Sequence, residues 1–335
     1  LASLAYLLLG GGLTGLAVIH SITWWLEGGT GVLWIGKLYA PVRFEGSWKD
    51  LKSYLHHGIL TCICSVSCAF LLQGSLILYR SVAGLDAGTG QFALAVQALI
   101  LMGSLPGYLT TGALPVLSRS ALRGDGKARF FTESMIRATI IGGAALGIAG
   151  LALAPRLIVT LFGASYGEAG VLLGWASWLL IPLTVATTIT GIFQSRGEYA
   201  VPTLFAVLAV AVLLLAIHPM IAAAGKAGAI GALGIALLVQ SAGLAAAMKR
   251  SGRLDPVASI LKPFLAVLPA CMVYFAMRDL GIVSLFAGWS VLVATTVFFR
   301  VLSREEWTAL RLAGRALSPS RADGGDRDST GSTKS

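Results

Sequence analysis

Residues 200–247 read AVPTLFAVLAVAVLLLAIHPMIAAAGKAGAIGALGIALLVQSAGLAAA, and they contain two long apolar runs on either side of Lys226. The first run covers residues 200–222, and the second covers residues 227–247. An apolar run of about 20 residues is long enough to cross the hydrocarbon core of a membrane as one α-helix. We therefore predict two consecutive membrane spans that are joined by a short connection at Lys226.

The same pattern recurs along the whole chain of 335 residues. Residues of the apolar set AVILMFWYC make up 56% of the chain, and charged residues make up only 12%, about half of the usual share. This composition excludes an ordinary water-soluble enzyme, because too few polar groups are available to cover its surface. We predict an all-α, polytopic membrane helix bundle with about nine transmembrane helices. The predicted spans are 3–25, 58–80, 91–117, 136–154, 169–193, 200–222, 227–247, 262–278 and 281–302.

The basic residues predict how these spans are oriented. If the connection 26–57 is cytoplasmic, 21 of the 25 Lys and Arg residues fall on the cytoplasmic side, as the positive-inside rule requires. The four residues on the opposite side are Arg80, Arg156, Lys226 and Arg278. This orientation places Leu1 outside and the C-terminus in the cytoplasm, and we expect further spans to precede Leu1. The net charge of +10 then reflects topology and attraction to lipid headgroups, and we expect no nucleic-acid partner.

Several kinds of chemistry find no support in the sequence. No nucleotide-binding motif occurs, and Cys64 and Cys68 lie one turn apart in an apolar run, where small packing residues are the better interpretation. All fifteen acidic residues fall at or outside the ends of the predicted spans, whereas sites for cationic drugs typically need a carboxylate within the bilayer. We therefore predict no enzymatic activity, no metal, no cofactor and no catalytic residue.

Three predicted spans carry polar residues at helical spacing, so that each set falls near one helix face. Such residues either line a pathway or serve as ordinary contacts between membrane helices. If a set does line a cavity, nearby cations without carboxylates favour an anionic substrate such as a phosphate head. The sets are Cys62, Ser65, Gln73 and Arg80; then Gln97, Ser104, Tyr108 and Thr111; and then Thr184, Thr187, Gly191 and Gln194.

Residues 89–119, TGQFALAVQALILMGSLPGYLTTGALPVLSR, resemble a stretch of the Wzx-type polysaccharide flippases in the MOP exporter superfamily. The family pattern opens with a "vGxYxxA" motif, and here Phe92 stands in place of the usual Tyr. Residues 161–169, LFGASYGEA, resemble the "lfGxxYxxA" segment of the same family. The residues that match the first stretch are Gly90, Phe92 and Ala95 at its start and Pro115, Leu117, Ser118 and Arg119 at its end.

This resemblance implies a two-lobe, MATE-like transporter with twelve or fourteen spans, of which the chain would supply the sixth to the fourteenth. The chain would be the C-terminal lobe of such a transporter with part of the lobe before it. The regions are then the last span of an incomplete N-terminal lobe (1–25), a cytoplasmic lobe connector (26–57), the C-terminal helical lobe (58–303), an amphipathic interfacial helix (304–317) and a disordered tail (318–335).

The resemblance also implies a function in the bacterial cytoplasmic membrane. By alternating access the protein would flip a polyprenyl-pyrophosphate glycan from the inner to the outer leaflet during polysaccharide biosynthesis. Its further partners would be membrane lipids, the polysaccharide polymerase and other export machinery. Members of the family often carry an acidic residue where this chain has Gln73, so coupling to a cation at that position is not expected.

We predict that Arg80 and Arg137 contact the phosphates of the substrate and that Gln73, Gln97 and Tyr108 line its route. Three other functions remain as alternatives. A multidrug exporter of the same superfamily predicts carboxylates within the bilayer in upstream spans. A membrane glycan ligase or glycosyltransferase predicts a long outer loop with catalytic residues. A regulatory or partner-binding membrane protein would have lost transport altogether.

Overall fold

The structure is a computed structural model, and it describes residues 13–38, 48–84, 87–122, 127–252, 254–255, 257–277 and 281–301. These residues form helices joined by short turns, and no strand occurs among them, which confirms the predicted all-α class for this part of the chain. The chain divides into two compact units, Leu1–His56 and His57–Ser335, and each is described by itself. The predicted interfacial helix at 304–317 and the predicted tail at 318–335 lie outside the described residues.

The first unit contains α2 (Leu13–Leu38) and the first residues of α3 (Trp48–Ala69). Helix α2 continues to Leu38, so residues 26–38 of the predicted connection are helical. The Thr30 hydroxyl donates a hydrogen bond of 2.8 Å to the Leu26 carbonyl of its own helix, so this polar group is satisfied without a partner helix.

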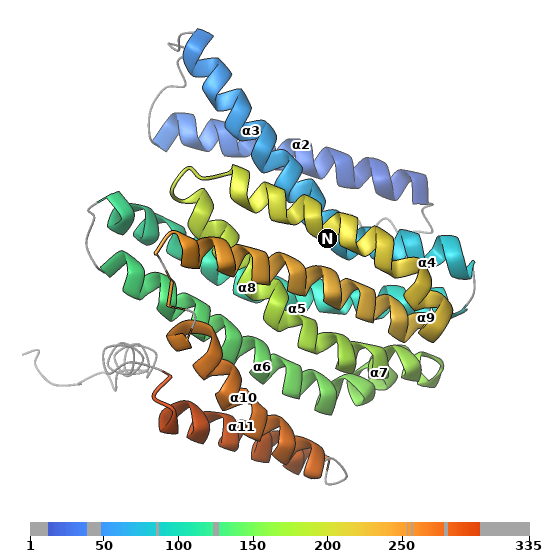
Figure 1. The fold of residues 1–335 in the computed structure, drawn as a ribbon. Helices are drawn as coiled ribbons and strands as arrows, with labels where there is room; N and C mark the ends of the chain where they lie inside the picture. The colour runs from blue at the N-terminus through green and yellow to red at the C-terminus, as the bar shows by residue number, and fades with distance from the viewer. Residues whose placement is uncertain are drawn as a thin grey trace, which may run out of the picture. The chain divides into compact units, whose positions relative to one another are not determined.

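The second unit is built from helices that follow one another through short connections (Figure 1). After the remainder of α3 come η1 (Phe70–Gly74), α4 (Ser75–Ala83), α5 (Ala87–Leu122), α6 (Lys127–Phe162), η2 (Ala164–Tyr166), α7 (Gly167–Ala176), η3 (Ser177–Leu179), α8 (Leu180–Gln194), α9 (Ala200–Arg250), η4 (Val257–Leu261), α10 (Lys262–Ala276) and α11 (Ile282–Phe298). The elements η1 and η4 are single π-helical turns, and η2 and η3 are 3₁₀ turns.

Five segments of the described part are helical, long and apolar enough to cross a membrane. A polytopic membrane protein is therefore supported by the structure, and the count of about nine spans stays a prediction. The predicted span 169–193 is not one continuous α-helix, because the 3₁₀ turn Ser177–Leu179 separates α7 from α8. The five segments are Tyr54–Ala83, Arg129–Phe162, Ala164–Gln194, Ala200–Arg250 and Val257–Ala276, and the apolar helices Gly88–Ser104 and Ile282–Phe298 are shorter.

Helix α9 is sharply bent between the two apolar runs of residues 200–247. Ala224 has φ −140° and ψ 17°, and Gly225 has φ 55° and ψ −129°, so neither residue is helical. Glycine reaches a positive φ without the steric penalty that a Cβ atom brings. In Figure 1 the chain turns back at this point, and the two halves of α9 run in opposite directions.

The segment α7–η3–α8 lies at the centre of the second unit. In the most apolar 18-residue stretch of this segment 72% is buried, against 28% to 33% in the corresponding stretches of the other four long segments. Helix α6 packs on α7 and α8, and its backbone lies close to Gly170 of α7, where an added Cβ would lie 2.6 Å from Pro155 Cα. The unit has two hydrophobic cores, and α6, α8 and α9 contribute to both of them. The first core also contains residues of α5 and α7, and the second also contains residues of α10 and α11.

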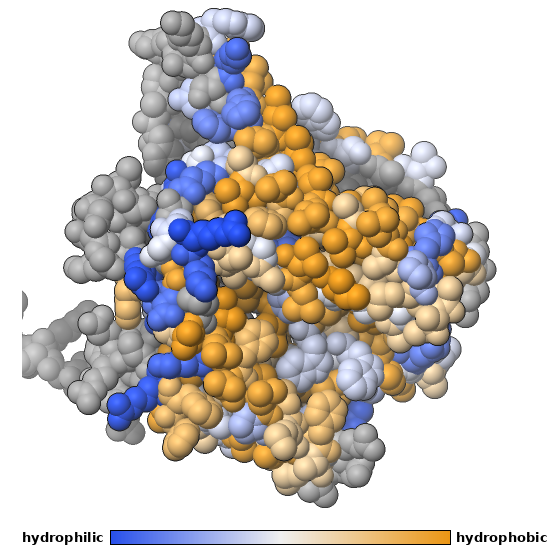
Figure 2. Space-filling model, in the orientation of Figure 1, coloured by the Kyte–Doolittle hydropathy of each residue, from blue (hydrophilic) through white to orange (hydrophobic). Residues whose placement is uncertain are grey.

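Polar contacts join helices at two opposite ends of this unit. At one end the Lys226 ammonium lies 2.8 Å from both Glu168 Oε2 and Gln91 Oε1, which joins the bend of α9 to the starts of α7 and α5. At the other end Glu133 of α6 accepts a hydrogen bond from the Asp255 backbone N–H, just after α9. Between these ends the face that Figure 2 shows is mostly hydrophobic, and an apolar surface of this kind is what lipid requires of a spanning bundle.

Candidate functional site

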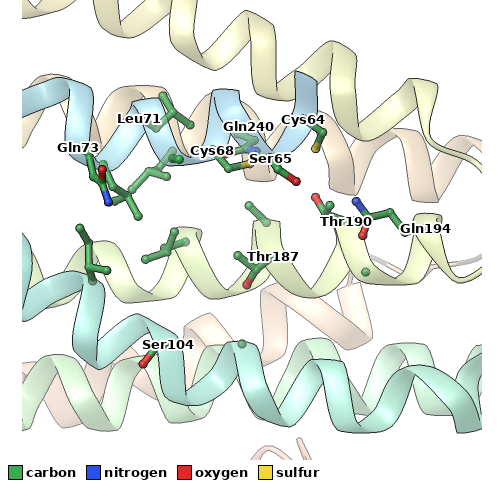
Figure 3. Close-up of a pocket in the computed structure, with 18 of the residues that line it drawn as sticks. Cys64, Ser65, Cys68, Leu71, Gln73, Ser104, Thr187, Thr190, Gln194 and Gln240 are labelled. Carbon is green, nitrogen blue, oxygen red and sulfur yellow. Dashed lines mark hydrogen bonds between the residues drawn. The ribbon is translucent and has the colours of Figure 1, made fainter. Parts of the chain in front are cut away.

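A cavity of about 580 Å³ lies in the second unit, between α3 with η1, α5, α8 and the second half of α9. In Figure 3 the side chain of Ser65 on α3 points toward Thr190 and Gln194 on α8. The cavity is open to the outside of the bundle, so a ligand can enter it. Its polar lining residues are Cys64, Ser65, Cys68, Gln73, Ser104, Tyr108, Thr187, Thr190, Gln194 and Gln240.

The three predicted polar faces meet in this cavity. Ser65 and Gln73 come from the first set, Ser104 and Tyr108 come from the second, and the third contributes Thr187, Gly191 and Gln194. The remaining members of the sets that the structure describes, Cys62, Arg80, Gln97 and Thr184, are not among the lining residues. The side chains of Thr111 and of the motif residues Pro115, Leu117, Ser118 and Arg119 lie outside those that the structure describes.

The π-helical turn η1 brings Gln73 to the cavity. A π-helical turn takes up about one residue more than an α-turn, so it rotates the following residues relative to those before it. Eight residues separate Ser65 from Gln73, which an α-helix would place about 80° apart. The extra residue brings the two side chains close to one face. Gly74 permits this turn, since a Cβ there would lie 2.8 Å from the ring of Phe70.

Several polar groups of the cavity have no hydrogen-bond partner among the described residues. The Thr190 hydroxyl is buried and has no hydrogen-bond partner among the described residues. The side-chain amides of Gln73 and Gln194 likewise make no hydrogen bond with residues that the structure describes. The Thr187 hydroxyl is satisfied, because it donates a bond of 2.9 Å to the Thr184 carbonyl of its own helix.

Sequence reasoning did not single out Gln240, which lines the cavity from α9. Its side chain is 2% exposed, and its amide donates a hydrogen bond of 3.5 Å to Cys68 Sγ. An amide in a run of apolar residues is a signal that could have identified it, because an amide within the bilayer needs a polar partner. Cys64 and Cys68 are free thiols, and among the described residues no group of three metal-ligating side chains is found.

The structure does not bring all five predicted site residues together. Gln73 and Tyr108 line the cavity. Gln97 lies instead in a separate apolar groove between α5 and α6. Arg80 is exposed in the last turn of α4, about 10 Å along the helix axis from Gln73.

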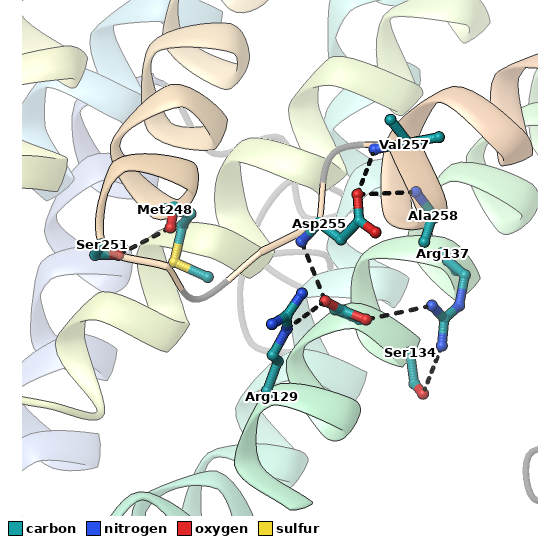
Figure 4. A network of polar contacts seen from close by, with 9 residues as sticks. Arg129, Ser134, Arg137, Met248, Ser251, Asp255, Val257 and Ala258 are labelled. Atoms are coloured by element: carbon teal, nitrogen blue, oxygen red, sulfur yellow. Dashed lines mark hydrogen bonds and ion pairs between the residues drawn. The ribbon is translucent and has the colours of Figure 1, made fainter. Parts of the chain in front are cut away.

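Arg137 belongs to a polar network near the N-terminal end of α6 (Figure 4). Its side chain is 8% exposed, and its guanidinium lies 3.8 Å from Glu133 Oε2 and 3.3 Å from Ser134 Oγ. The same carboxylate accepts a hydrogen bond of 2.9 Å from Arg129. Glu133 therefore balances much of the charge of Arg137, and the role of Arg137 in phosphate contact stays a prediction.

The described lining residues offer hydroxyl, amide and thiol groups but no carboxylate, imidazole, ammonium or guanidinium group. Such a lining can exchange hydrogen bonds with uncharged polar groups of a ligand, both as donor and as acceptor. A comparison of the sequence with protein-family models and with curated proteins finds no match.

Proposed function

We propose that the chain is part of a membrane transporter that flips a lipid-linked oligosaccharide from the inner to the outer leaflet of the bacterial cytoplasmic membrane. In this proposal the chain forms about nine spans and supplies the C-terminal lobe of a two-lobe, MATE-like transporter. One observation carries the proposal: polar faces from three separate helices meet in one open cavity of about 580 Å³ inside an otherwise apolar bundle.

The chemistry of the cavity supports a glycan as the cargo. Sugars present many hydroxyl groups, and the free amides of Gln73 and Gln194 and the free hydroxyl of Thr190 can both donate to them and accept from them. Arg80 and Arg137 lie outside this cavity, so in the proposal they contact the pyrophosphate near the two membrane surfaces.

The positions of the ionic contacts support the predicted alternation of the spans. Lys226, Glu168 and Gln91 meet at the end that the charge distribution assigns to the outside. Glu133, Arg129 and Asp255 meet at the end that it assigns to the cytoplasm. Cytoplasmic segments rich in Lys and Arg are the usual sign of this orientation.

A multidrug exporter of the same superfamily is the alternative with the nearest architecture. Binding of a hydrophobic cation within a membrane typically depends on a buried carboxylate. The described residues that line the cavity include no Asp or Glu, which favours the glycan over the cationic drug.

A translocation assay tests the proposal. The protein is reconstituted into vesicles that carry a fluorescent polyprenyl-pyrophosphate oligosaccharide, and a lectin added outside reports the glycans that have crossed. We expect transfer above that of empty vesicles, and we expect the paired change Thr187→Val with Gln194→Leu to lower its rate. The control is Thr160→Val, because Thr160 also bonds a carbonyl of its own helix but is exposed outside the cavity.

Two results would count against this function. Transfer no faster than in empty vesicles would contradict it outright. Transport of ethidium in place of the glycan, by the same vesicles, would favour the multidrug exporter.

A further inference from the structure

A second open cavity, of about 460 Å³, forms a groove on the outside of the second unit. It lies between α6, α8, the second half of α9 and α10. Leu238 and Phe264 on its rim are 55% and 40% exposed, so the groove opens to the surroundings of the bundle. Its lining is apolar apart from Ser241, whose hydroxyl donates a hydrogen bond of 3.2 Å to the Leu238 carbonyl.

The length of the groove matches one leaflet of a bilayer. Along α9 its lining residues extend from Leu238 to Ala245, and Lys249 follows one turn later. Lys249 lies eleven residues after Leu238, which corresponds to about 16 Å along the helix. The hydrocarbon core of a bilayer is about 30 Å thick, so this distance covers about half of it. The groove and the helical turn that leads from it to Lys249 together therefore have about the depth of one leaflet.

A free cation stands at the end of the groove. Leu238, Ala242, Ala245 and Lys249 follow one another at steps of four, three and four residues, so they share one face of α9. Side chains of a helix tilt toward its N-terminus, so Lys249, one turn beyond the lining residue Ala245, can direct its ammonium toward this end of the groove. Lys249 is exposed and makes no hydrogen bond or ion pair with a residue that the structure describes.

The acidic groups near this end already have partners. Glu133 lies 2.9 Å from Arg129 and 3.8 Å from Arg137. Figure 4 shows Asp255 accepting hydrogen bonds from the backbone N–H groups of Val257 and Ala258. The carboxylates are thus engaged, while the charge of Lys249 is not. An apolar groove that ends at a free cation is complementary to a molecule with a hydrocarbon chain and an anionic head.

We propose that this groove is a binding site for an anionic phospholipid of the leaflet that faces the basic end of the bundle. One acyl chain occupies the groove, and the phosphate lies on the ammonium of Lys249. The site is separate from the polar cavity and does not depend on the function proposed for that cavity.

Native mass spectrometry of the detergent-solubilised protein tests this site with two lipids of identical acyl chains, palmitoyl-oleoyl phosphatidylglycerol and palmitoyl-oleoyl phosphatidylcholine. We expect the first to be retained more tightly. Lys249→Gln should weaken its binding about fivefold, which corresponds to about 1 kcal/mol for one basic residue near a lipid surface. Ala242→Phe should displace both lipids, because the ring fills the groove.

Two matched variants separate this site from general effects of charge and size. Arg250→Gln removes a neighbouring exposed charge that lies about 100° away around the helix, and it should leave retention unchanged. Ala294→Phe adds the same ring at an exposed position of α11 that does not line the groove, and it should also leave retention unchanged. Both variants also report whether such changes disturb folding.

Three results would overturn the proposal. Equal retention of the two lipids would remove the role of the cation. An equal effect of Lys249→Gln and Arg250→Gln on lipid retention would show that the lipid does not bind specifically at Lys249. Stronger binding of a polyprenyl phosphate, with displacement of phosphatidylglycerol, would assign the groove to the tail of a transported lipid.

Discussion

Replacing Gly170 with Ala tests how closely α7 packs on α6. An ideal Cβ at Gly170 lies 2.6 Å from Pro155 Cα and 3.0 Å from the Ala154 carbonyl oxygen, and both are backbone atoms that cannot rotate away. Ordinary contacts begin near 3.4 Å, so α7 must move by close to 1 Å. Inserting one carbon into a closely packed interior destabilises a protein by about 1–3 kcal/mol. We expect a loss of this size in the free energy of unfolding.

Gly142→Ala is the matched control, because Gly142 also lies within a helix but has no atom within 4 Å of its added Cβ. There the change removes the flexibility of Gly and should stabilise the helix by up to about 1 kcal/mol. The two variants should therefore differ by about 1–4 kcal/mol. Titration of the detergent-solubilised protein with SDS, followed by circular dichroism, measures this difference. Equal stability of the two variants would refute the close approach of α6 and α7.

Two further changes test the ionic contacts at the ends of the bundle. Glu133→Gln should destabilise the protein by about 2–4 kcal/mol, because it removes a carboxylate beside the largely buried Arg137. Arg129→Gln, at a side chain that is 54% exposed, should have a much smaller effect in the same titration. Lys226→Met should speed amide hydrogen exchange at the start of α7, since it removes the contact of 2.8 Å with Glu168, and unchanged exchange there would show that this contact does not hold the helix ends together.

The sequence predicts the helices well because lipid imposes a simple requirement. Spans need long apolar runs, and the pair of runs around Lys226 corresponds to the two halves of α9 on either side of its bend. The 3₁₀ turn at Ser177–Leu179 could not be predicted, since these residues contain neither Pro nor Gly and lie within one long apolar run. Its position depends on how α7 and α8 pack against α6.

The polar faces were predictable from spacing alone, but the cavity that each residue lines was not. Gln97 is spaced to share a face with Ser104 and Tyr108, yet it lines a different groove, together with Leu101. It lies on the border between two faces of α5, and the neighbouring helices decide which of them it joins. Gln73 reaches the cavity through a π-helical turn, which spacing based on regular α-helices does not anticipate.

The central claim is that the polar cavity carries the glycan, and site-specific photocrosslinking tests it most directly. A photoreactive amino acid is placed at Thr187 inside the cavity or at Thr160 outside it, and the vesicles carry radiolabelled polyprenyl-pyrophosphate oligosaccharide. We expect crosslinks at Thr187 that excess unlabelled substrate suppresses, and few at Thr160. Equal labelling at both positions, or labelling at Thr187 that excess substrate does not suppress, would contradict it.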